Sequence, residues 1–214
     1  MNGRDRFLIA LKNGKPDRLP CQIHNWMQYY LNTYLKGMDV YQAYEYFGMD
    51  PVIYTFPNLI FDEKDLKNWA YEYKSLGVDK DGVESFIQTY HTPEGDLTVK
   101  GARNQFTSWE TEHMIKNEDD FEIFRKYYPV PIKADWSPIL EAKKKIGDKG
   151  IVRTWWQCYG QPGVWQSLTC LIGTEPAIMK AIDDPDWTHY ALKGISDKAI
   201  RGIENMGKIE ADLV

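Results

Sequence analysis

The chain ends with Ile209-Glu210-Ala211-Asp212-Leu213-Val214, a stretch whose apolar residues predict a buried strand. It follows a helix that is expected to end at Gly207, because glycine is common just after the last turn of a helix. No turn or polar tail comes after Val214, so the strand is predicted to lack a neighbour. We therefore expect the chain to be the N-terminal part of a larger fold, whose later residues complete any site.

Working outward from this stretch, three other segments read as strands. We predict core strands at about 19–24, 51–55, 151–157 and 208–214, separated by helices. Strands that alternate with helices are typical of a parallel sheet. A barrel of eight such strands needs about 250 residues. The sequence therefore predicts an α/β fold of the TIM-barrel-like (β/α)8 type, N-terminal part only, as a single domain of residues 1–214.

The helices between these strands carry clear start and stop signals. Asp39 is expected to cap a helix that runs to Phe47, and Asn117 another that ends before Pro129. Ser137 and the proline after it open a third helix, which ends at Gly147. Asp184-Pro185 opens the longest helix, whose apolar residues form a nearly continuous stripe.

Residues 62–116 do not follow the alternation of strand and helix. Residues 83–90 alternate between apolar and polar, and 92–96 have the composition of a turn before a returning strand. We interpret 62–116 as an antiparallel hairpin excursion inserted into the parallel scaffold. The incomplete barrel would leave an open sheet edge, which predicts a homo-oligomer or a completing C-terminal half.

Composition favours a cytoplasmic protein that acts on small molecules. The chain has 214 residues, a formal charge of −5, and 43% hydrophobic and 27% charged residues. No apolar run approaches the roughly 18 residues of a membrane span, and the net charge argues against nucleic acid as a partner. Three scattered cysteines fit a reducing compartment. Eight Trp and fourteen Tyr suit either the wall of a ligand cleft or an aromatic core.

A set of short motifs, in this order along the chain, resembles the uroporphyrinogen decarboxylase superfamily. The motifs are Arg4-Asp5-Arg6-Phe7-Leu8-Ile9-Ala10-Leu11, Pro16-Asp17-Arg18-Leu19-Pro20, Gly160-Gln161-Pro162-Gly163, Gly173-Thr174-Glu175, Asp183-Asp184-Pro185-Asp186 and Glu210-Ala211-Asp212. This superfamily contains the decarboxylase and corrinoid-linked methyltransferases. The resemblance implies a TIM-barrel-like fold in proteins longer than this chain.

The same resemblance weakens the decarboxylase assignment. Decarboxylases carry an arginine pair after the first strand, whereas this chain has residues 24–30 without arginine. The family's aspartate after the second strand is absent from residues 55–58, and its later tyrosine is replaced by Leu168. An octa-carboxylate substrate needs charge-assisted hydrogen bonds. Arg18, Arg103 or Arg153 would have to replace the pair.

Chemistry in parallel barrels lies at the carboxyl ends of the strands. We predict catalytic roles for His24, Tyr159 and Asp212. We predict substrate contacts from Asn25, Trp26, Tyr54, Asn58, Trp156, Gln157, Gln161 and Trp109. Each has a structural alternative: a satisfied histidine, a packed strand end, a carboxylate that binds backbone, or, for Trp109, a solvated turn.

No metal site is predicted in this chain. The family's methyltransferases hold zinc through a His-x-Cys pair and a distant cysteine, and the chain has no His-x-Cys. Zinc is therefore expected only in a longer parent, and a corrinoid only on a partner protein. The leading expectation is methyl transfer to or from a small molecule. The alternatives are tetrapyrrole decarboxylation and a non-catalytic binding module completed by a partner chain.

Overall fold

The computed structural model describes residues 1–156 and 158–214, which form two compact units. Unit 1 comprises Met1–Asn58, Asp135–Trp155 and Lys208–Val214, and unit 2 comprises Leu59–Ala134 and Trp156–Gly207. The short strands β2 (Asn58–Ile60) and β7 (Lys133–Asp135) pair with each other in a two-stranded sheet.

Unit 1 is built around two parallel strands, β1 and β8. Its elements are α1 (Gly3–Leu11), α2 (Gln28–Tyr34), α3 (Val40–Phe47), β1 (Val52–Tyr54), α6 (Ser137–Ile146) and β8 (Ile151–Arg153). The register pairs Val52 with Ile151 and Tyr54 with Arg153, and Leu213 adds a single parallel bridge to Arg153. Ile53, Val152 and the buried faces of α3 and α6 form the core of this unit.

The local sequence explains why these elements form where they do. Asp39 and Gln42 make a reciprocal capping box at the start of α3, and Gly48 ends the helix in the left-handed conformation at φ 61°. Before β8, a Cβ on Gly150 would lie 2.2 Å from the Pro51 carbonyl oxygen. Only glycine therefore permits the two strands to approach this closely at their start.

A buried carboxylate joins the N-terminal segment to the start of β1. Asp50 accepts hydrogen bonds from the guanidinium groups of Arg6 and Arg18 and from the backbone N–H of Cys21. Arg18 is therefore committed to Asp50 as an ion pair. Arg6 also pairs with Asp17, and this contact lowers the Asp17 pKa below its ordinary value.

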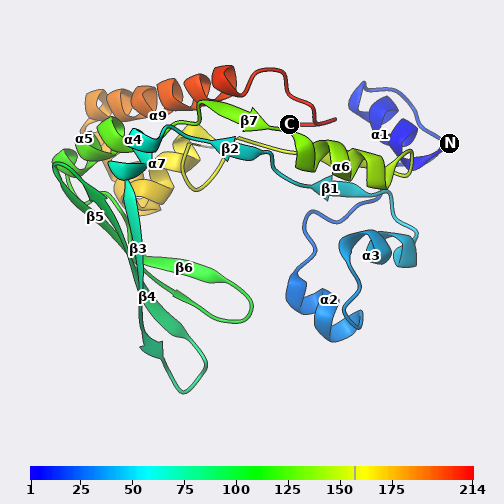
Figure 1. Ribbon diagram of the computed structural model, residues 1–214, viewed down its shortest axis with the longest axis horizontal. Helices are drawn as coiled ribbons and strands as arrows, with labels where there is room; N and C mark the ends of the chain where they lie inside the picture. Colours follow the sequence, from blue (N-terminus) through cyan, green and yellow to red (C-terminus); the bar gives the residue numbers. More distant parts are fainter. Residues whose placement is uncertain (157) are drawn as a thin grey trace. The chain divides into compact units, whose positions relative to one another are not determined.

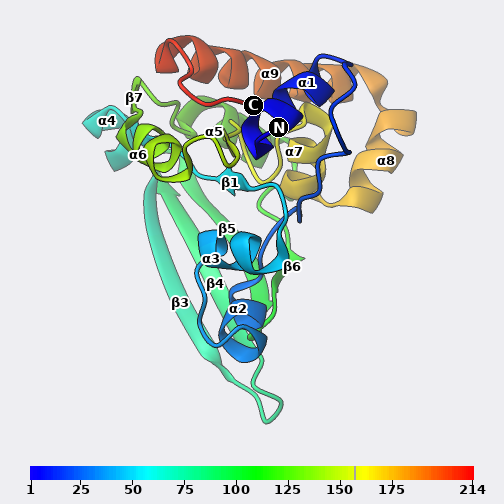
Figure 2. The ribbon, with the colours of Figure 1, turned by 90° about the vertical axis from the view of Figure 1, so that its right-hand side faces the viewer.

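Unit 2 combines a four-stranded antiparallel sheet with helices. Its elements are α4 (Glu63–Lys67), β3 (Ala70–Val78), β4 (Glu84–Thr92), β5 (Gly95–Arg103), β6 (Ser108–Glu112), α5 (Glu118–Tyr127), α7 (Val164–Ile172), α8 (Thr174–Asp183) and α9 (Pro185–Met206). The sheet order is β3-β4-β5-β6. Figures 1 and 2 both show the far ends of β3 and β4 projecting away from the helices of this unit.

The core of unit 2 lies where the sheet meets α5, α7 and α9. Leu97 and Val99 of β5 pack with Phe121 and Phe124 of α5, and with Leu168 of α7. Cys158, Ala191 and Ile195 belong to the same cluster. The asparagine cap of α5 is confirmed, since the Asn117 side chain accepts from the Asp120 N–H.

The predicted fold class is wrong. The chain is a mixed α/β structure with two small sheets and a four-stranded antiparallel sheet, and the described residues show no barrel closure. The antiparallel excursion has four strands, so it is larger than a hairpin. Of the four predicted core strands, 51–55 and 151–157 contain β1 and β8, whereas 19–24 and 208–214 do not form strands.

The failed strands have identifiable causes. Segment 19–24 contains Pro20, which lacks an N–H, and Leu19 is 83% exposed, so the segment offers little to a buried parallel sheet. Its main-chain hydrogen bond to this region, 2.7 Å from the Asp50 N–H to the Cys21 carbonyl, is made two residues before β1 begins. Segment 208–214 forms one bridge instead of a strand, and β8 stops at Arg153.

Candidate functional site

The carboxyl ends of β1 and β8 bring together two polar side chains. Tyr54 is the last residue of β1 and Arg153 the last of β8, and the parallel register places them opposite each other. Register partners in a parallel pair project to the same face of the sheet. The Arg153 Nη1–H consequently donates a hydrogen bond of 3.0 Å to the Tyr54 hydroxyl oxygen.

This hydrogen bond continues to His24, which lies on the exposed loop before α2. The Tyr54 hydroxyl oxygen is 3.3 Å from His24 Nδ1. Because the guanidinium can only donate, the hydroxyl oxygen accepts from Arg153, and its own proton is available to Nδ1. When the hydroxyl donates to Nδ1, the neutral ring carries its proton on Nε2. Arg153, Tyr54 and His24 therefore form a polar chain that presents N–H donors at its two ends.

Aromatic rings surround the guanidinium of Arg153. Its central carbon lies 5.2 Å from the Tyr54 ring centroid and 6.0 Å from that of Trp155. Phe56 contacts Trp155 edge to face at 4.4 Å. Among the described residues, the buried Arg153 Nε–H has no acceptor. Since a cation already occupies the aromatic faces, this arrangement suits an anion better than a second cation.

Four of the predicted site residues line one small cavity in unit 1. His24, Asn25, Trp26 and Tyr54 surround about 80 Å³ together with apolar residues of β1 and α3. Small-molecule sites usually enclose roughly 300–1,000 Å³. The cavity is therefore too small to enclose a whole small-molecule ligand.

Asp212 has a different environment from the one predicted for a catalytic group. Its carboxylate is 4% exposed, accepts two hydrogen bonds of 2.8 and 2.7 Å from Arg4, and accepts one of 3.0 Å from the Val152 N–H. Lys143 adds an ion pair at 3.1 Å. These partners hold the pKa of Asp212 at about 2, although burial acts to raise it. Asp212 therefore fastens the last segment to β8 and α1.

The remaining predicted residue of unit 1, Asn58, donates a hydrogen bond of 3.1 Å to Asp135. Gln157 lies outside the described residues. The other predictions fall in unit 2, and each has a packing or surface environment there.

Tyr159 lies against Phe124 and Tyr128 in the aromatic core of unit 2, and burial raises its pKa. The Trp156 Nε1–H donates to the Ala199 carbonyl of α9 at 3.0 Å. Gln161 lies in an exposed turn, and its carbonyl accepts from Ser167 at 2.9 Å. Trp109 is half-exposed on β6. None of these side chains lines the cavity of about 550 Å³ that described residues of unit 2 form.

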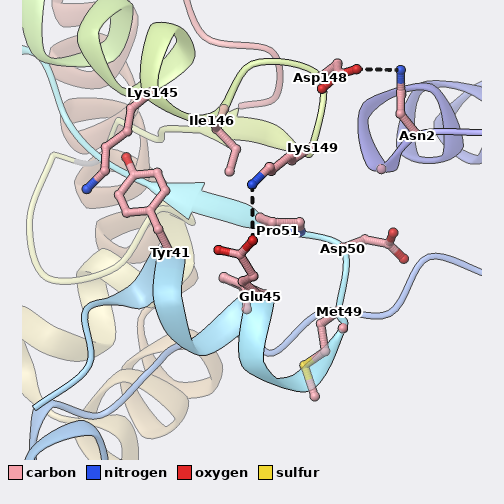
Figure 3. Close-up of a pocket in the computed structure, with 13 residues that line it drawn as sticks. Asn2, Tyr41, Glu45, Met49, Asp50, Pro51, Lys145, Ile146, Asp148 and Lys149 are labelled. Carbon is pink, nitrogen blue, oxygen red and sulfur yellow. Dashed lines mark hydrogen bonds and ion pairs between the residues drawn. The ribbon is translucent and has the colours of Figure 1, made fainter.

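A larger cavity of unit 1, of about 420 Å³, lies at the amino ends of β1 and β8, away from the strand ends where sites were predicted. Figure 3 shows Lys145 beside the Tyr41 ring and Lys149 directed at Glu45. The Lys145 Nζ is 3.7 Å from the Tyr41 centroid, and the Lys149–Glu45 pair is 3.4 Å long. Both lysines are thus engaged by neighbours.

Sequence reasoning did not place Arg153 in the site. It was named only as one of three arginines that would have to replace a missing pair. The available signal was its position at the end of a strand predicted to run parallel to the strand of Tyr54. The other two arginines named as replacements form ion pairs: Arg18 with Asp50, and Arg103 with Glu84 in unit 2.

The described residues contain no group of three or more His, Cys, Asp or Glu side chains arranged to hold a metal ion. In the described part of the chain, no helix has both the length and the apolar character required to cross a bilayer.

Comparisons with protein-family models, with curated proteins and with solved structures found no match.

Proposed function

We propose that the hydrogen-bonded residues Arg153, Tyr54 and His24 bind the acidic end of a small-molecule substrate. We further propose that the protein is an enzyme of the methyltransferase-like branch of the uroporphyrinogen decarboxylase superfamily. The reaction is methyl transfer between that substrate and a corrinoid carried by a partner protein. The observation that carries the proposal is the guanidinium of Arg153 joined through Tyr54 to His24 at the carboxyl ends of β1 and β8. The family assignment rests on the motifs of the sequence.

The N–H donors of Arg153 and His24 support an anionic ligand. A guanidinium has several N–H donors, of which the described residues engage one, from Nη1 to Tyr54. A carboxylate accepts two such donors side by side, and a charged acceptor makes these bonds stronger than neutral ones. The His24 Nε2–H supplies a further donor from the loop before α2.

Free methylcobalamin and two thiols provide the test. Mercaptoacetate carries a carboxylate, whereas mercaptoethanol is similar in size and uncharged. In the presence of the protein, the absorbance of the methyl–cobalt bond should disappear faster with mercaptoacetate than with mercaptoethanol. Arg153→Met should remove most of that preference, and Arg103→Met, which changes a paired arginine of unit 2, should leave it unchanged. Turnover of neither thiol would refute methyl transfer.

Tetrapyrrole decarboxylation is the second candidate, because Arg153 supplies one of the cations that this reaction needs. A substrate with eight carboxylates requires more than one guanidinium, and Arg18 and Arg103 are committed to Asp50 and Glu84. This candidate is therefore the weaker one. Release of carbon dioxide from uroporphyrinogen, abolished by Arg153→Met, would reverse the order.

The cytoplasm is the proposed location, and the observation that supports it is that Cys21, Cys158 and Cys170 are free thiols.

A further inference from the structure

A third cavity, of about 550 Å³, is lined entirely by residues of unit 2, and none of them belongs to the Arg153 site. The loop between β6 and α5 forms one side, and the end of α7 with the first turns of α8 and α9 forms the other. Its volume is in the range of roughly 300–1,000 Å³ that small-molecule sites enclose. Ile115, Ile172, Pro176 and Trp187 give it an apolar wall, and His113 lies among its polar residues.

The backbone around His113 is held firmly. Met114 and Ile115 are buried in the core of unit 2. The Ile115 N–H donates a hydrogen bond of 2.9 Å to the Leu171 carbonyl, one of the last carbonyls of α7, which have no partner within the helix. His113 is therefore presented to the cavity from a fixed position.

The partners of the His113 ring determine which nitrogen carries the proton. Nδ1 lies 2.8 Å from the Glu110 carboxylate and 3.2 Å from the Cys170 carbonyl oxygen. Both are acceptors, so Nδ1 must donate, and the neutral ring has its lone pair on Nε2. The described residues supply no hydrogen bond to Nε2. Its neighbour is Gly173, where a Cβ would lie 3.1 Å from Nε2.

The charged residues of the cavity neutralise one another. The Lys180 Nζ lies 2.8 Å from Glu118 and 2.8 Å from Asp184, and it is 5.0 Å from the Trp187 ring centroid. Lys116 lies 3.5 Å from Glu112 and donates to the Thr98 carbonyl. A ligand therefore meets paired charges, an apolar wall and one imidazole lone pair.

From this geometry we infer that the cavity binds a neutral aromatic molecule that carries a hydroxyl group, with the hydroxyl donating to His113 Nε2 and the ring lying against Trp187 and Ile172. A phenol has this combination of apolar body and single donor. The imidazole accepts the bond without reorganising, because Glu110 and Cys170 already fix its tautomer.

The test compares 4-ethylphenol with 4-ethylanisole, whose oxygen is methylated and cannot donate. Binding to the full chain is followed by calorimetry or by saturation transfer. One net hydrogen bond should make the phenol bind roughly fivefold more tightly. His113→Phe keeps a flat ring but no acceptor, so it should abolish the preference while it leaves the anisole affinity within about twofold. His189→Phe, on the exposed surface of α9, should keep the preference.

Two further measurements make the result decisive. Trp187→Ala should weaken both ligands and keep their ratio, provided that its thermal melt shows a folded chain. Nitrogen NMR of His113 should show the proton on Nδ1, with the Nε2 signal moving when the phenol binds. Equal affinity of the two ligands, a preference that survives in His113→Phe, or no binding of either ligand would overturn the inference.

Discussion

Replacing Asp212 by asparagine should destabilise unit 1 at neutral pH. The side chain keeps its size but loses the charge that faces Arg4 and Lys143. The pKa of Asp212 falls from 3.8 to about 2 in the folded chain. At roughly 1.36 kcal/mol per pKa unit, this corresponds to about 2 kcal/mol of stability. Arg4 and Lys143 are about one-third exposed, so water solvates them in the variant and the cost should not greatly exceed that value.

The pH dependence follows from the sign of the shift. A carboxyl whose folded pKa is depressed stabilises the fold at every pH above its unfolded pKa, and this contribution is lost as pH falls through the folded pKa. The difference in free energy of unfolding between wild type and Asp212→Asn should therefore be complete at pH 7. It should shrink between about pH 4 and pH 2.

Urea denaturation at pH 7 and pH 3, followed by tryptophan fluorescence, measures both effects. Glu141→Gln is the matched control, because it removes a carboxylate from the exposed face of α6 in the same unit. Equal stability of wild type and Asp212→Asn at pH 7 would refute the assigned role. So would a loss of the same size at both pH values, since that would reflect shape and not charge.

Three other substitutions test the packing. Lys198 is 8% exposed and donates to the Tyr128 carbonyl at 2.7 Å, and burial lowers its pKa to about 8. Lys198→Met should therefore raise stability at pH 7. Urea midpoints should show that this gain shrinks toward pH 10, because the wild-type lysine becomes neutral. A gain that is constant with pH would contradict this account. Gly150→Ala should lower the melting temperature markedly, because its Cβ would lie 2.2 Å from the Pro51 carbonyl oxygen; an unchanged melt would mean that β1 and β8 separate easily. Phe121→Ala, at a fully buried position, should cost about 3–5 kcal/mol in urea denaturation, whereas the exposed Phe106→Ala should cost little.

Local signals in the sequence predicted the helices that have clear caps and stops, whereas α2, α4, α7 and α8 were not predicted. The helix capped by Asp39, that capped by Asn117 and that opened by Ser137 all form where expected, and α9 is the longest helix described. Caps and glycine stops act within one or two turns, so a short window of sequence contains the information that determines them.

Sheet architecture could not be obtained in the same way. A run such as 19–24 has strand-like composition, but whether it pairs depends on residues far away and on burial of both faces. The (β/α)8 prediction extended a local alternation to a closed barrel, and this step needed partners that the described residues do not provide. The antiparallel segment was easier because alternation and turn chemistry lie close together in its hairpin.

The candidate site shows the same division between local and distant information. His24 and Tyr54 were chosen as strand-end residues, and the structure joins them by a hydrogen bond. The loop around His24 lacks the arginine pair, and the sequence offered Arg153 only as one of three replacements; the structure shows that it reaches Tyr54 from 99 positions away through the parallel register of β1 and β8. A register is a property of two strands and not of one. The charge of the site must therefore be counted across paired strand ends. Among the described residues this count gives one guanidinium beside one histidine, which is the basis for proposing a single carboxylate as the ligand.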